Sequence, residues 1–240
     1  MKMTTTRLLS LLVLVATVFV TGCATKFERQ AFNSEAATHV KKITVSQWSD
    51  QEEYPVFIVN HPGNNLGLIG AIAAAADRTS KTKRVNDLLE PAKTKLTSTF
   101  YDKALPSLKS LGYDTLSVSA KRSDKLDDVR IALAKDQGQH AILLLTLDAS
   151  YLAAGMSTDY FPAVVLGAEL TDSKSKAVLY REQYHYGYNN GVKEVSHIDA
   201  AATCRFKDID TLTANIDITR KCMTDSVDVL LNQLLNDLKR

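Results

Sequence analysis

The run Ala141-Ile142-Leu143-Leu144-Leu145-Thr146-Leu147 decides the fold, because all but one of its residues are apolar. A strand with one exposed face alternates apolar and polar residues, so a run that is apolar on both faces is typical of the centre of a sheet. This run opens a predicted strand over residues 140–151, which follows a predicted strand over 114–120 and a predicted helix over 125–137. Strand, helix and strand in that order predict one right-handed parallel crossover.

Further elements extend this unit in both directions along the chain. Residues 40–48 and 54–60 are short β-branched and aromatic runs that predict two strands upstream. Residues 161–170 and 177–188 alternate apolar and polar positions and predict an antiparallel hairpin downstream. Apolar periodicity predicts helices over residues 66–89, 91–111 and 212–238. The predicted fold is a single α+β domain, whose mixed sheet has one βαβ crossover and a C-terminal hairpin and is covered by helices, including a long C-terminal one.

The N-terminus has the pattern of an exported protein. Lys2 and Arg7 flank the start of an apolar run over residues 8–20, which has the length of a secretory signal and is shorter than the roughly 20 residues of a membrane-spanning helix. The run closes in Val20-Thr21-Gly22-Cys23, which resembles the lipobox of bacterial lipoproteins. A plain signal peptide and an uncleaved anchor are the alternatives.

The lipobox resemblance implies a lipid anchor and a location in the cell. It implies cleavage before Cys23, a diacylglycerol on the cysteine sulfur and an acyl chain on the new amine, and these covalent chains are the only cofactor that the sequence implies. No aspartate follows the cysteine, which in enterobacterial lipoproteins implies release to the outer membrane. The predicted organisation is a signal peptide over 1–22, a lipidated tether over 23–39 and a periplasmic domain over 40–240.

Removal of this leader leaves a chain without net charge. The full sequence holds 29 Lys and Arg against 27 Asp and Glu. The leader contains two cations and no acid, so the mature chain has 27 of each sign. Nucleic-acid binding normally requires a basic face, so we expect no nucleic-acid partner.

Cys204 and Cys222 are the cysteines that remain once Cys23 carries lipid. In an exported protein these two could form a disulfide, and two buried free thiols are the alternative. A continuous helix across their separation of 18 positions would hold the sulfurs about 27 Å apart, so a bridge requires a turn in between. Metal ligation is less favoured because the sequence has no C-x-x-C spacing.

Small residues recur along the start of the predicted helix 66–89. They are Gly63, Gly67, Ala71 and Ala75, with Gly70 beside them. A helix face with so few side chains allows very close backbone approach. It could contact another helix, a partner subunit or the bilayer, or the helix could lie tight against its own sheet. The basic residues further along the helix could meet lipid phosphates or form a solvated face.

A row of tyrosines marks the second strand of the predicted hairpin. Tyr184, Tyr186 and Tyr188 share a face with Tyr180, and such a row could stack on sugar rings or bind a peptide. The apolar partner strand fits burial beneath the C-terminal helix instead. Glu182 lies on the same face and favours the ligand interpretation, so both interpretations stay open.

Several of these segments together resemble a known family. Gly67-Leu68-Ile69-Gly70-Ala71, residues 81–86, a helix that opens near Pro91 and the leucine-rich C-terminal helix resemble a family of uncharacterised proteobacterial envelope lipoproteins. At the level of fold, a lipidated α/β domain with this element order is similar to periplasmic assembly lipoproteins. Neither resemblance implies an activity.

The sequence carries no catalytic signature. Its five histidines are scattered, with no H-E-x-x-H, and no G-x-S-x-G elbow presents a nucleophile. We expect a non-enzymatic lipoprotein, anchored in the outer membrane and facing the periplasm, that binds an envelope protein partner or its own copies. The alternative is a binding protein for a small ligand or a cell-wall glycan that uses the tyrosine row. We expect no metal site.

Overall fold

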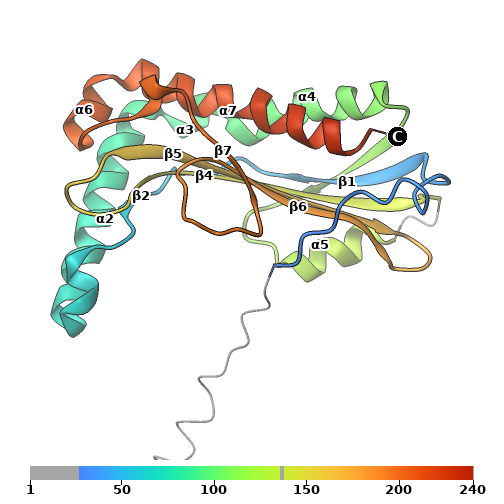
Figure 1. Cartoon of the computed structure of the whole chain (residues 1–240), viewed down its shortest axis with the longest axis horizontal. Helices are drawn as coiled ribbons and strands as arrows, with labels where there is room; N and C mark the ends of the chain where they lie inside the picture. Colours follow the sequence, from blue (N-terminus) through green and yellow to red (C-terminus); the bar gives the residue numbers. More distant parts are fainter. Residues whose placement is uncertain (1–26, 136–137, 240) are drawn as a thin grey trace, which may run out of the picture.

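A computed structural model describes residues 27–135 and 138–239. They form one seven-stranded mixed sheet with helices on both faces (Figure 1). The strand order is β3-β1-β4-β5-β6-β7, and β2 pairs with the far end of β4. The predicted class, a single α+β domain with a mixed sheet and a long C-terminal helix, is confirmed. The predicted lipobox with Cys23 lies outside the described residues.

The elements follow one another along the chain as strands and helices in alternating groups. The strands are β1 (Lys42–Trp48), β2 (Val56–Ile58), β3 (Asp114–Ala120), β4 (Ala141–Ala153), β5 (Tyr160–Asp172), β6 (Val178–Gly187) and β7 (Ser196–Ile198). The helices are α2 (Gly67–Leu89), α3 (Pro91–Thr94), α4 (Leu96–Ser110), α5 (Leu126–Leu133), α6 (Ile209–Ala214) and α7 (Ile216–Asp237), with short 3-10 turns η2 (Pro62–Asn65) and η3 (Ala202–Cys204).

The predicted crossover from β3 through α5 to β4 is present, but its two strands are not neighbours. β1 lies between them and runs parallel to both, with Ile43 opposite Thr115 on one side and Ala141 on the other. Ile43 and Val45 are fully buried, as expected for a strand with neighbours on both sides. A sequence pattern predicts the order of elements along the chain but not the order of strands in the sheet. An earlier strand, here β1, can therefore insert between two later ones.

The long antiparallel pairing of β4 with β5 forms the centre of the sheet. It joins thirteen residue pairs, from Ala141 opposite Asp172 to Ala153 opposite Tyr160. Leu143 and Leu145 are fully buried, which confirms the central position predicted for this run. β5 then pairs antiparallel with β6, so the predicted hairpin is also confirmed.

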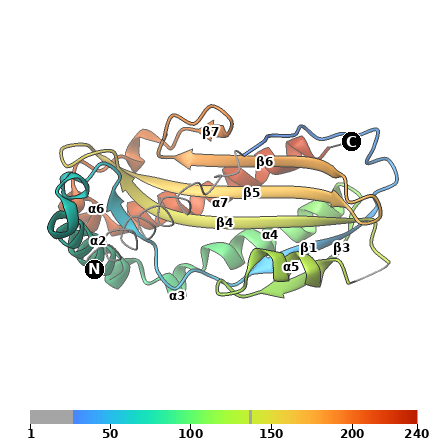
Figure 2. The same cartoon turned by 90° about the horizontal axis from the view of Figure 1, so that it is seen from below.

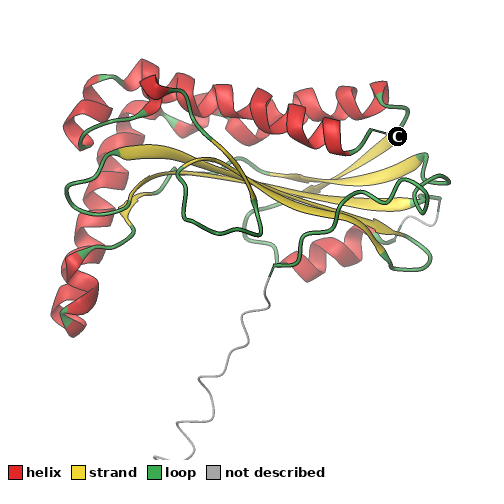
Figure 3. Ribbon diagram, in the orientation of Figure 1, coloured by secondary structure: helices red, strands yellow, loops and turns green. Residues whose placement is uncertain are grey.

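Helices cover the two faces of the sheet unequally. α4 and α7 lie side by side over one face, and α5 lies on the other face beneath β1 and β3 (Figures 1 and 2). The Tyr151 hydroxyl donates a 2.6 Å hydrogen bond to the Thr219 carbonyl and so joins β4 to α7. Figure 3 shows that the α5 face carries little helix and much loop. One face of the sheet is therefore closed, and the other is only partly covered.

Two predicted helices are each broken into two. The predicted helix 91–111 breaks at Lys95, which has a φ of 44°, so α3 and α4 meet at an angle there. The predicted helix 212–238 breaks at Asn215, whose side-chain amide donates 2.8 Å to the Thr211 carbonyl and ends α6. Apolar periodicity continues across both breaks, so it could not reveal them.

Helix α2 is hydrogen-bonded to the segment around β2 through its second half. Thr82 accepts a hydrogen bond from the Val56 backbone, and Asn86 both accepts from and donates to the Tyr54 backbone, so this half lies on β2. The first half extends beyond the sheet (Figure 1). The interpretation that α2 lies tight against its own sheet is therefore wrong for its first half. None of the helices that the structure describes is long and apolar enough to cross a membrane.

The tether predicted over residues 23–39 is shorter than expected. Gln30 forms a β-bridge with Arg181 of β6, and the Asn33 amide donates to the Leu179 carbonyl. Ala37 is fully buried. Residues from 30 onward therefore pack against the domain, and of the described residues only 27–29 lie before that contact.

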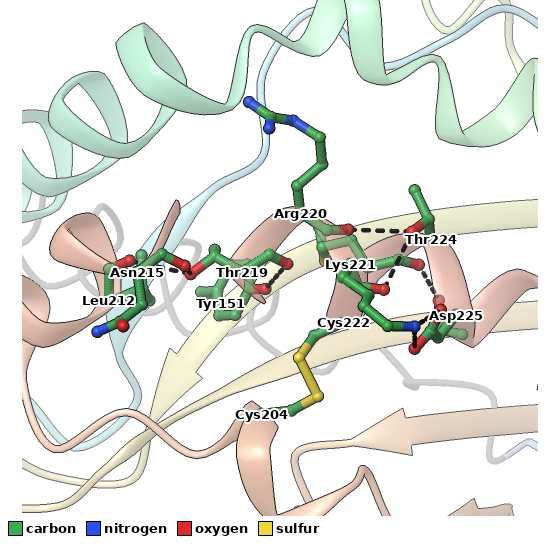
Figure 4. Close-up of a disulfide and its surroundings, with 12 residues drawn as sticks. Tyr151, Cys204, Leu212, Asn215, Thr219, Arg220, Lys221, Cys222, Thr224 and Asp225 are labelled. Carbon is green, nitrogen blue, oxygen red and sulfur yellow. Dashed lines mark hydrogen bonds and ion pairs between the residues drawn. A yellow bond between two sulfur atoms is a disulfide. The ribbon is translucent and has the colours of Figure 1, made fainter. Parts of the chain in front are cut away.

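Cys204 and Cys222 form a disulfide, as one of the two interpretations predicted, with their Cα atoms 5.7 Å apart. η3, α6 and the break at Asn215 supply the required turn between them. Figure 4 shows the bridge joining the loop before α6 to the side of α7. It fastens the segment after β7 to the helix that covers the sheet.

We expect the disulfide to contribute substantially to stability. Replacing both cysteines by alanine should lower the free energy of unfolding by about 3 kcal/mol, because a cross-link over this separation removes loop-closure entropy from the unfolded chain. Urea unfolding of the variant measures the loss, and reduction of the unmodified protein should reproduce it. An unchanged urea midpoint would contradict the prediction.

Candidate functional site

The partly covered face of the sheet contains a cleft of about 560 Å³ between α5 and strands β4 to β6. Leu144, Thr146 and Gly167 form part of its floor, and Leu126 of α5 forms part of one wall. Gly167 keeps the floor low, since a Cβ atom there would lie 2.6 Å from the Thr146 hydroxyl. Phe27 and Glu28, the first described residues, also line it.

A buried carboxylate between two guanidinium groups lies in this cleft. Glu169 of β5 stands directly opposite Arg181 of β6 and accepts a 2.7 Å hydrogen bond from its Nε atom. Arg130 of α5 reaches the other oxygen of Glu169. The Glu169 side chain is only 10% exposed, whereas both arginines are partly exposed. The cluster therefore fastens α5 to the sheet and places two cations at the cleft.

The cluster determines the ionisation of Glu169. Burial opposes ionisation, but the hydrogen bonds and positive charges of Arg130 and Arg181 outweigh it and lower the pKa of Glu169. With Glu169 ionised, the three-residue cluster has an excess of one positive charge, and the exposed Glu28 brings one further carboxylate to the cleft. Each guanidinium has five N–H donors, and the ion pairs with Glu169 use one nitrogen of each group. The cluster can therefore offer further donors to a carboxylate or another anionic group.

The tyrosine row lies on the opposite, closed face of the sheet. Tyr184 and Tyr186 are buried beneath α7, and Tyr188 is half-buried at the end of β6. The Tyr184 hydroxyl donates 2.6 Å to Asp237 of α7, and burial raises the pKa of Tyr184 well above its usual value. No flat aromatic surface is available for a sugar ring at Tyr184 or Tyr186, so the tyrosine-lined ligand surface is a wrong prediction.

Glu182 is also buried, and a neighbouring arginine compensates its negative charge. Its carboxylate forms an ion pair with Arg29, in the segment that precedes β1. A second, smaller cavity of about 280 Å³ lies between this pair and Asp237. The acid that favoured a ligand on the tyrosine face thus fastens the N-terminal segment to β6.

The small residues predicted to form a partner face have three different positions. Gly63 lies in η2 and contacts Gly70 of α2 so closely that a Cβ atom on either would lie 2.3 Å from the other's carbonyl oxygen. Gly67 has a φ of 61° and turns the chain from η2 into α2. Ala71 and Ala75 line a groove of about 350 Å³ between α2 and β2. The two glycine positions Gly63 and Gly70 are therefore explained by contact within the chain.

The basic residues of α2 each have a partner within the domain. Arg78 lies 4.7 Å from the centre of the Phe57 ring, and Arg84 forms a 2.6 Å ion pair with Asp210. Lys81 and Lys83 each pair with an aspartate on α2, at positions 77 and 87. The solvated-face interpretation fits Arg78, Lys83 and Arg84, which are exposed, whereas the Lys81 side chain is only 15% exposed.

Metal-ligating side chains do not gather in the described parts of the chain. Across residues 27–135 and 138–239, no three His, Cys, Asp or Glu residues lie close enough together to hold an ion.

Comparisons with known proteins give little further information. No protein-family model matches the sequence, and no curated protein matches it. Among solved structures, the chain is similar to a crystal structure described as a homologue of a neuraminyllactose-binding hemagglutinin from Helicobacter pylori. That similarity has a TM-score of 0.33 and 12% identity, over 90% of this chain and 89% of the other.

The cluster of Arg130, Glu169 and Arg181 was not predicted from the sequence. A weak signal was present, because Glu169 and Arg181 carry opposite charges on the two strands of the predicted hairpin, where cross-strand pairing favours such a combination. Arg130 could not be placed, since its contact depends on how α5 lies against strands that it does not precede directly.

Replacement of Glu169 by Gln should make stability depend differently on pH. At pH 7 we expect a loss of about 2 kcal/mol in the free energy of unfolding, because hydrogen bonds to charged groups are lost. Because the folded-state pKa of Glu169 is lowered, its contribution is present above the ordinary glutamate pKa and disappears as the pH falls through the folded value. Urea unfolding at pH 7 and pH 3 measures both differences.

The same cleft provides a matched control for this prediction. Glu28 also lines it but is exposed, so Glu28→Gln should change the free energy of unfolding by less than about 0.5 kcal/mol. Equal losses in the two variants at pH 7, or a Glu169→Gln loss that persists at pH 3, would contradict the role assigned to the cluster.

Proposed function

We propose that this chain is a non-enzymatic, lipid-anchored binding module of the bacterial cell envelope. Its anchor is a lipid on Cys23, which the lipobox resemblance implies, and its location is the periplasmic side of the outer membrane. Its binding site is the cleft beside α5, and its occupant is an acidic segment of an envelope protein partner. A small acidic ligand in the same cleft is the second candidate.

The cleft with its two guanidinium groups is the observation that supports this proposal. Binding sites are commonly clefts of 300–1,000 Å³ with an apolar lining and a few converging polar groups. This cleft has an apolar floor and wall at Leu144 and Leu126, and converging donors at Arg130 and Arg181. Guanidinium groups bind carboxylates with good geometry, so an acidic group is the occupant that these two donors favour.

The position of the cleft fits a membrane-anchored protein. Phe27 lines the cleft and lies four residues after Cys23 in the sequence. Four residues span about 13 Å at most. If Cys23 carries lipid, the cleft is presented close to the membrane, where envelope partners are concentrated.

Photo-crosslinking in living cells tests the proposed site. A crosslinking amino acid at Leu126 or Gln183, both in the cleft, should capture one specific band, because an occupant would contact both walls. The matched control position is Leu116, which is as exposed as Leu126 but lies on β3 at the far edge of the sheet. It should capture nothing specific.

A charge-reversal variant tests the chemistry of the occupant. Arg130→Glu should abolish the band captured from Leu126, whereas Arg130→Lys should retain much of it. Thermal unfolding of both variants checks that the fold persists. Identical bands from Leu116 and Leu126, or a band indifferent to the charge at residue 130, would refute the proposed site, and a band of small-molecule mass would favour the second candidate.

A further inference from the structure

The free end of α2 is apolar and exposed. Leu66, Leu68, Ile69 and Ile72 are 70%, 78%, 83% and 61% exposed. Residues 66–76 contain no charged or hydrogen-bonding side chain. We call these eleven residues the α2 tip. Large aliphatic side chains gathered at this level of exposure mark a surface that is covered in the working protein.

The α2 tip is built to project. η2 runs beside the first turns of α2, and the chain reverses at Leu66 and Gly67, so these residues form the extremity of a small helical hairpin. The close contact of Gly63 with Gly70 holds its two arms together. Figure 1 shows this end of α2 reaching well past the sheet. The rest of the domain therefore leaves the tip uncovered.

We propose that the α2 tip inserts into one leaflet of the bilayer that carries the lipid anchor. Ten helical residues from Gly67 to Ala76 rise about 15 Å, which exceeds the roughly 5–10 Å reached by helices that bury an apolar surface at the headgroup and acyl boundary. Asn64 and Asn65 are exposed beside the tip and limit the depth to this boundary. The first charged residues, Asp77 and Arg78, then remain outside the hydrocarbon.

The entry point of the chain supports a bilayer over other occupants. The described chain begins at Phe27 on the side of the sheet that carries α5, and the α2 tip projects on that same side (Figure 1). Gln30 is fixed to β6 and lies seven residues after Cys23, a length that spans about 23 Å at most, so an anchor there keeps this side of the domain near the membrane. This inference therefore rests on the proposed anchor.

Fluorescence from a single labelled residue tests this insertion in the lipid-carrying protein that begins at Cys23. In a Leu68→Cys variant the new thiol is the one available, since Cys204 and Cys222 are bridged and Cys23 carries lipid. An NBD label there, in vesicles of phosphatidylethanolamine and phosphatidylglycerol, should shift its emission to shorter wavelength and be quenched by brominated acyl chains. The matched control is Leu88→Cys, an exposed leucine at the other end of α2, which should show neither effect.

Two glutamate variants make this experiment specific to the α2 tip. Ile69→Glu should abolish the shift and quenching of the label at residue 68, because a buried carboxylate opposes insertion. Ile131→Glu, at an isoleucine of α5 that is 60% exposed, should leave both unchanged. Both side chains point to solvent, so neither change should disturb folding.

Three outcomes would overturn the inference. In the first, the label at residue 68 behaves like the label at residue 88. In the second, its emission shifts without vesicles as the protein concentration rises, which would indicate a second copy of the chain. In the third, its emission shifts on vesicles without quenching by bromolipid, which would indicate a protein partner. Flotation of the vesicles reports the anchor separately. Protein that floats with an unquenched label contradicts only the insertion, whereas protein that does not float contradicts the proposed anchoring.

Discussion

The structure depends on the thirteen-residue antiparallel pairing of β4 with β5. One face of this pair is covered by α7, which buries Leu166 and Tyr151 together with the tyrosines of β6. The other face carries Glu169 and the floor of the cleft. The edge of β4 that faces away from β5 holds β1 at one end and β2 at the other, and β2 holds the second half of α2. The cleft and the projecting helix are therefore both positioned by one ladder.

Much of the fold could be predicted from the sequence, because its strands and helices have strong local periodicity. The central run after Ala141 and the β5–β6 hairpin were both predicted. The insertion of β1 between β3 and β4 and the breaks at Lys95 and Asn215 were not, since long-range pairing and single backbone angles leave little trace in apolar spacing. The pairing of β4 with β5 was not predicted either.

The candidate site could be predicted less well, because none of its residues forms a recognisable sequence motif. Arg130 and Glu169 are 39 positions apart and become a site only when α5 lies on the sheet. The tyrosine row had a clear sequence signal, but the same spacing serves a buried face under α7 equally well. A chain with 29 Lys and Arg against 27 Asp and Glu can still bury Glu169 and Glu182, since each has a guanidinium partner.

The cleft and the α2 tip lie on the same side of the sheet, and this is the side that we propose faces the membrane. Hydrogen–deuterium exchange tests this orientation most directly, by comparing the lipid-carrying protein on vesicles with a Cys23→Ser variant in solution. The account predicts slower exchange on vesicles in the backbone amides of residues 64–76, and no change in α4 or α7. Slower exchange in α4 and α7, with the α2 tip unchanged, would contradict it.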